Sequence, residues 1–106
     1  MQAEYGLEQL TSAVFTISES HETLQQRLIS ACVYDILNIN AERDLPQEMR
    51  EKFDTLCQLL NCTPATGNQG SIQETISGMN DDEARRHIDT IAQLYRELSE
   101  YLAMRP

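Results

Sequence analysis

The chain has 106 residues, 41% of them hydrophobic and 24% charged, a balance typical of a globular domain and not of a disordered segment. Seventeen acidic residues against eight basic ones give a formal net charge of -9, which disfavours direct binding to nucleic-acid phosphates. The most apolar stretch, residues 31–37, is interrupted by Asp35 and is much shorter than a membrane span. We therefore expect one domain over residues 1–106, with neither nucleic acid nor a membrane as a direct partner.

The first residues of the chain lack the basic start and the apolar run of a secretory signal. Three cysteines, Cys32, Cys57 and Cys62, cannot all pair within one chain, so a full disulfide framework is not expected. Cys32 and Cys57 fall within helical patterns, where a buried thiol acts as a small hydrophobic side chain. These features favour a cytoplasmic protein.

Apolar residues recur at alternating steps of three and four, the spacing of one helix face, and no stretch alternates like a strand. The first helix is expected over about residues 3–16, with Gly6 weakening its first turn. Serine, threonine and isoleucine at residues 16–20 predict a break, followed by a central second helix over about residues 20–38. Because the same rhythm crosses the break, the alternative is one long helix over residues 3–38, which would need a partner helix to cover it.

The third helix has a strong start signal, since Asp44 can cap it and Pro46 fits its first turn. It should end near Asn61, and Glu48 and Lys52 are spaced to form a surface ion pair along it. Its expected buried stripe consists of Met49, Phe53, Leu56 and Leu60.

Residues 62–70 contain proline, glycine and asparagine without an apolar period, and are expected to form the one mobile loop. A capping box at residues 71–74 then opens a short helix that Gly78 ends. A second capping box at residues 80–83 opens the last helix, residues 81–104. The stripe of this helix comprises Ala84, Ile88, Ile91, Tyr95, Leu98 and Leu102, flanked by Leu94 and Tyr101.

The elements taken together predict an all-α fold. Because short connections make sequential helices antiparallel, we expect a small antiparallel helical bundle of four main helices plus one short helix.

The candidate ligands for a metal do not have the spacing that a metal site requires. Cys57 and Cys62 are separated by four residues, unlike a zinc knuckle, and neither His21 nor His87 completes a Glu-x-x-His motif. Cys57 lies near a helix carboxyl end, where the helix dipole opposes a thiolate. We therefore expect no metal, no cofactor, no catalytic residue and no small-molecule substrate; an enzyme would need a pocket that joins His21 or His87 to carboxylates.

Both histidines have two interpretations. His87 flanks the stripe of the last helix with Glu83 one turn away, which favours a half-buried side chain with a satisfied charge. His21 lies either at the solvent edge or on the apolar seam of the second helix, where it would form a pH-sensitive contact.

Asp35 falls inside the apolar arc of the second helix, where a carboxylate needs a partner. In one interpretation it reaches solvent or an arginine of another helix. In the other it is a polar contact that fixes the register of a helix–helix interface.

The stripe of the last helix packs in the core or contacts another protein, and Tyr95 and Tyr101 are the expected aromatic anchors in the second case. The function predicted from the sequence is a non-enzymatic helical protein–protein interaction module, with a homodimer as one form. The alternative is an acidic inhibitor or nucleic-acid mimic that binds a basic protein. The predicted protein-binding residues are Asp35, Ile91, Tyr95, Leu98, Tyr101 and Leu102.

Overall fold

The computed structural model describes residues 1–63 and 68–105, and within them the fold is all-α, without a strand. The predicted mobile loop falls partly on residues 64–67, outside the described part of the chain. The elements in chain order are α1 (Ala3–Glu19), α2 (Leu24–Tyr34), η1 (Ile36–Asn38, a 3-10 helix), α3 (Ala41–Asp44), α4 (Gln47–Leu59), α5 (Gln69–Ser77) and α6 (Asp81–Ala103).

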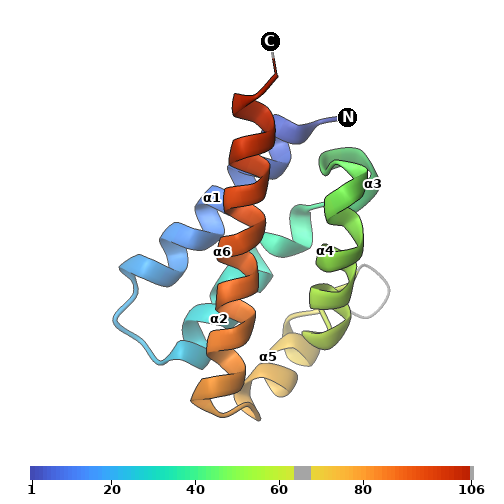
Figure 1. The fold of residues 1–106 in the computed structure, drawn as a ribbon. Coiled ribbons are helices and arrows are strands. Elements are labelled where there is room, and N and C mark those ends of the chain that lie inside the picture. Colours follow the sequence, from blue (N-terminus) through green and yellow to red (C-terminus); the bar gives the residue numbers. More distant parts are fainter. Residues whose placement is uncertain (64–67, 106) are drawn as a thin grey trace.

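The helices pack as a small bundle around α1, α2 and α6, as the sequence predicts at this level (Figure 1). Helix α6 packs along α1 and α2, while α4 lies on its other side and runs in the opposite direction (Figure 1). Helix α5 contacts α2, and the two chain termini lie at the same end of the molecule (Figure 1). No helix in the described residues has both the length and the apolar character needed to cross a lipid bilayer.

The predicted break after the first helix is confirmed, although α1 continues to Glu19 before the chain turns. Ser20 adopts an extended backbone, and the Thr23 hydroxyl then caps α2 by accepting a hydrogen bond from the Gln26 N–H at 3.1 Å. The alternative of one helix over residues 3–38 is therefore wrong, since α2 folds back to pack against α1.

Asp44 does not cap the third helix, contrary to the sequence-based prediction. It ends α3, a short helix that the sequence did not predict, and its side chain is fully buried. Its carboxylate accepts hydrogen bonds from the Asn40 N–H at 2.8 Å and from the Arg43 guanidinium at 2.7 and 2.8 Å. Helix α4 begins after Pro46 without a side-chain cap, and Arg50 ties it to α3 by donating to the carbonyls of Ala41, Glu42 and Leu45 at 3.0 to 3.1 Å.

Gly6 allows α1 to approach α3 more closely than any other residue would. A Cβ atom at this position would lie 2.5 Å from the backbone oxygen of Asp44. The same junction contains a hydrogen bond from the Gln2 N–H to the Arg43 carbonyl at 2.6 Å, and the Arg43 guanidinium lies 5.4 Å from the centre of the Tyr5 ring. The glycine is thus a contact point between helices and not only a weak position in the first turn.

The last two helices start at asparagine caps. Asn80 accepts a hydrogen bond from the Glu83 N–H at 2.9 Å, which confirms the predicted start of α6. Asn68 caps α5 by accepting from the Ser71 N–H at 2.9 Å, so the predicted cap at residue 71 is wrong and residues 69 and 70 belong to the helix.

Replacing Gly6 by alanine should lower the free energy of unfolding by about 1–3 kcal/mol, because the added methyl group overpacks the junction. Helix propensity alone predicts the opposite sign, a gain of about 1 kcal/mol. Gly78→Ala is the matched control, since a Cβ there would meet its nearest atoms at 3.7 and 3.8 Å. Urea denaturation of both variants checks this, and an unchanged or increased stability of Gly6→Ala would contradict the close approach.

Asp44 should make the stability of the fold sensitive to acid. Burial by itself raises the pKa of its carboxyl, but the hydrogen bonds from Arg43 and Asn40 outweigh burial and hold the pKa below its usual value. The carboxylate therefore stabilises the fold above pH ~4, and this contribution is lost as the pH falls through the lowered pKa. Asp44→Asn should cost about 1–3 kcal/mol at pH 7, and its deficit relative to the wild type should shrink in denaturation curves recorded below pH ~4.

Candidate functional site

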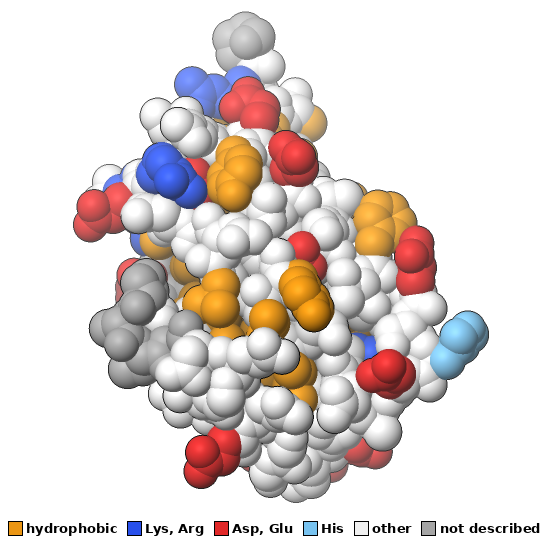
Figure 2. Space-filling view, turned by 180° about the vertical axis from the view of Figure 1, so that it is seen from behind, with side chains coloured by type: hydrophobic (Ala, Val, Ile, Leu, Met, Phe, Trp, Pro, Cys, Tyr) orange, Lys and Arg blue, Asp and Glu red, His pale blue; other side chains and the backbone are white. Residues whose placement is uncertain are grey.

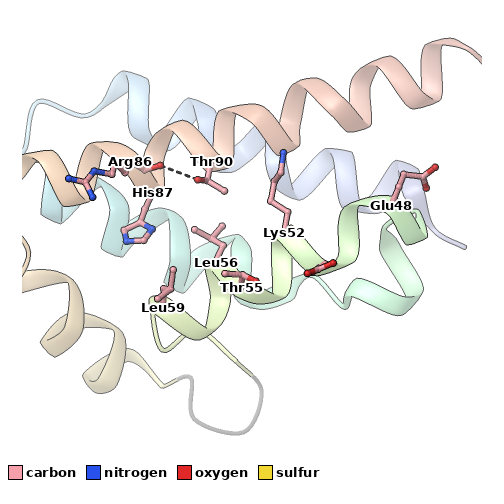
Figure 3. Close-up of a pocket in the computed structure, with 9 residues that line it drawn as sticks. Glu48, Lys52, Thr55, Leu56, Leu59, Arg86, His87 and Thr90 are labelled. Carbon is pink, nitrogen blue, oxygen red and sulfur yellow. Dashed lines mark hydrogen bonds between the residues drawn. The ribbon is translucent and has the colours of Figure 1, made fainter.

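A groove lies between α4 and α6 (Figure 3). It is on the side of α6 that faces away from α1 (Figure 1). It encloses about 500 Å³. We call it the α4–α6 groove; it is lined by Glu48, Glu51, Lys52, Thr55, Leu56 and Leu59 of α4 and by Arg86, His87 and Thr90 of α6.

The groove exists because α4 turns its apolar stripe toward the core and its polar side toward α6. Of the lining residues, Leu56 belongs to the buried stripe and is 2% exposed, so it forms an apolar floor. Lys52 bridges the two helices through an ion pair with Glu97, not with Glu48 as the sequence predicted. Both side chains of this pair are 40% exposed, which limits its contribution to stability to about 1 kcal/mol.

One end of the groove offers an exposed hydrophobic side chain. Leu59 is 57% exposed at the carboxyl end of α4, and the His87 ring extends toward it from α6 (Figure 3). Leu59 lies off the buried stripe of α4, so no core contact covers it. Leu59 is thus the exposed apolar side chain at this end of the groove, with the His87 ring beside it.

His87 is half-buried, as the sequence indicates, and its surroundings favour the neutral ring. Burial lowers the pKa of His87 below its usual value, Glu83 opposes this shift and Arg86 adds to it. In the described residues no hydrogen bond links His87 to a carboxylate, and Glu48 lies at the far end of the groove (Figure 3). The groove thus holds histidine and carboxylates without joining them in an acid–base pair.

The other end of the groove is acidic. Glu48 and Glu51 are exposed and form no ion pair within the described residues. The groove continues there into a hollow of about 270 Å³ whose lining includes Glu100, Tyr101 and Met104, and Met104 is 85% exposed. Unpaired carboxylates and the exposed side chain of Met104 therefore share this end of the α4–α6 surface.

Only part of the predicted contact set lies at this surface. Ile91 and Leu98 have no exposed area and belong to the core of the chain, while Tyr95 packs partly against that core. Tyr101 lines the hollow next to the groove, and its hydroxyl accepts a hydrogen bond from Arg105 at 2.6 Å. Leu102 is half-buried and faces a separate hollow with Met1 and Leu7.

Asp35 is 5% exposed and ends α2. The Thr16 hydroxyl of α1 donates to its carboxylate at 3.4 Å, so its contact joins two helices of the same chain. His21 is exposed in the turn between those helices and makes no seam contact.

Sequence reasoning missed the groove because its lining comes from polar positions of two helices. The available signal was Leu59, an apolar residue outside the stripe of α4. A large hydrophobic residue that a helical stripe leaves uncovered marks surface available for a contact.

Comparisons with protein-family models, with curated proteins and with solved structures gave no match to this chain.

The His87 ring should titrate below the ~6.5 of a free histidine side chain when followed by NMR. Because its pKa in the folded chain is lowered, the fold should lose stability as the pH falls through ~6.5, where the unfolded chain takes up the proton more readily. Arg86→Gln should raise this pKa and Glu83→Gln should lower it further. Shifts of the two variants in the same direction would contradict this electrostatic account.

Proposed function

We propose that the chain is a non-enzymatic protein-interaction module and that its α4–α6 groove receives a basic amphipathic helix of a partner protein. The observation that carries this proposal is a single groove with the exposed side chain of Leu59 at one end and the unpaired carboxylates of Glu48 and Glu51 at the other.

The apolar floor and its exposed end favour a partner with hydrophobic anchors. Leu56 and Leu59 stand one helical turn apart, and Tyr101 and Met104 continue the apolar surface beyond the acidic end. An amphipathic helix places apolar residues at steps of three and four along one face and can fill such a groove. The 13 residues of α4 span about 20 Å, enough to accompany roughly four turns of a partner helix.

The acidic side chains near the Glu48 end of the groove favour a basic partner. Glu48, Glu51 and Glu100 have no ion pair among the described residues, and the chain as a whole carries -9. Lysine and arginine on the polar face of a partner helix would complement them and speed association. A second copy of this chain would bring more carboxylates, so we favour a basic heterologous partner over a homodimer.

Calorimetry with two designed peptides tests the proposal. The first peptide is helical, with leucine on one face and lysine on the other; the second has alanine in place of each leucine. We expect only the leucine peptide to bind tightly, and Leu59→Ala to weaken it about ten-fold, or ~1.4 kcal/mol. Phe15→Ala is the matched control, since Phe15 is 56% exposed on α1, far in sequence from the groove, and should leave the affinity unchanged.

Equal binding of both peptides, with no effect of Leu59→Ala, would overturn the groove proposal. That result would instead favour the acidic inhibitor or mimic, which acts through charge alone and loses affinity steeply with added salt. Mass doubling in light scattering without peptide would favour self-association.

A further inference from the structure

The three cysteines of the chain, which the proposed function does not use, meet in one cluster. Cys32 comes from α2, Cys57 from α4 and Cys62 from the segment after α4. All three are free thiols, and none is more than 5% exposed. Their cluster joins α2 to the end of α4, on the side of α4 away from the α4–α6 groove.

The end of α4 folds Cys62 back onto Cys57. Asn61 adopts a left-handed backbone with φ of 55°, a conformation that asparagine tolerates after a helix. The Cys62 N–H then donates to the Cys57 carbonyl at 2.8 Å, and the Asn61 N–H to the Gln58 carbonyl at 3.3 Å. This Schellman-type turn brings Cys62 back onto the end of α4, where its thiol contacts that of Cys57.

The thiol of Cys62 is the polar centre of the cluster. When protonated, it donates to the Cys32 carbonyl at 3.8 Å. Contact with the Cys32 and Cys57 thiols lowers the pKa of Cys62, whereas the contact with Cys62 and burial raise the pKa of Cys57. The direction of these shifts favours Cys62 as the attacking thiol and Cys57 as its partner.

A cavity of about 250 Å³ leads to two of the three thiols. Its lining includes Cys57 and Cys62 but not Cys32. Apolar walls come from Ile39 and Phe53, and the acidic side chains of Glu42 and Asp54 also line it. Figure 2 shows hydrophobic side chains near the middle of the face opposite the view of Figure 1. Among the described residues no three acidic, histidine or cysteine side chains are arranged to hold a metal ion.

We propose that Cys57 and Cys62 form a dithiol that a small neutral hydroperoxide oxidises to an intramolecular disulfide. The Cys62 thiol releases its proton and its sulfur attacks the peroxide oxygen that carries the hydrogen. The O–O bond breaks, and the departing alkoxide or hydroxide takes up the released proton to leave as alcohol or water. Cys62 then carries a sulfenic acid. The Cys57 sulfur attacks the Cys62 sulfur, the S–O bond breaks, and the hydroxyl leaves as water with the Cys57 proton; the two thiols have given two electrons to the peroxide.

Charge and size favour the hydroperoxide over a glutathione-type disulfide. Glutathione disulfide is anionic and bulky, and it would meet Glu42 and Asp54 in a cavity of about 250 Å³. Hydrogen peroxide and tert-butyl hydroperoxide carry no charge, and apolar walls suit the alkyl group of the second. Cys32 does not line this cavity, which leaves it outside the reaction.

The test treats the reduced full chain with hydrogen peroxide, tert-butyl hydroperoxide or glutathione disulfide at equal concentration and follows the free thiols. With either hydroperoxide, the number of titratable thiols should fall from three to one. The rate of thiol loss should be at least ten-fold above the rate with glutathione disulfide. Trypsin then identifies the bond. Cys57 and Cys62 share the peptide of residues 53–85, which should lose the mass of two hydrogen atoms, whereas a bond to Cys32 would cross-link that peptide to residues 28–43.

Cys32→Ala should still form the disulfide, and Cys57→Ser should stop at the sulfenic acid of Cys62, detectable by dimedone labelling. The wild-type experiment needs no variant, so a folding defect in either one does not decide the outcome. A cross-link to Cys32, thiols that resist hydroperoxide in the folded chain, or faster reaction with glutathione disulfide would each overturn the proposal.

Discussion

The buried carboxylate of Asp44 is the interaction on which the arrangement of the helices depends. The Arg43 guanidinium and the Asn40 N–H satisfy this carboxylate, so that it can be buried at the end of the short helix α3 without an unpaired charge. The backbone oxygen of Asp44 then meets α1 at Gly6, the one residue type that allows this distance. Because Arg50 ties α4 to the carbonyls of α3, the position of α4 follows from the same junction.

Both candidate sites are consequences of where α4 lies. One side of the helix faces α6 across the α4–α6 groove, with Leu59 and two unpaired carboxylates available to a partner. The other side ends in the turn at Asn61, which places the Cys62 thiol against Cys57 at the base of a second cavity. The apolar stripe between these sides holds α4 on the core, so the candidate groove and the Cys57 thiol are positioned by the same helix.

The helical period of the sequence predicted the main helices, whereas tertiary contacts decided the partners of individual side chains. The cap at Asn80 and the stripe through Ile91 are local signals, and both are present in the structure. Asp44 looked like a helix cap because its neighbours in sequence fit that role, yet its partners are Asn40 and Arg43 of the preceding turn. Likewise Lys52 bonds across to α6, a choice that spacing within one helix cannot indicate. The groove and the thiol cluster were hidden for the same reason, since each joins residues from separate elements.

The most direct test of the central claim, that the α4–α6 groove is a docking site for a basic amphipathic helix, is an isotope-filtered NMR experiment on labelled chain with unlabelled peptide. Intermolecular NOEs should run from the Leu59 methyl groups and the His87 ring to the apolar face of the peptide. Contacts from the peptide to another face of the molecule, with none to Leu59 or His87, would contradict the account.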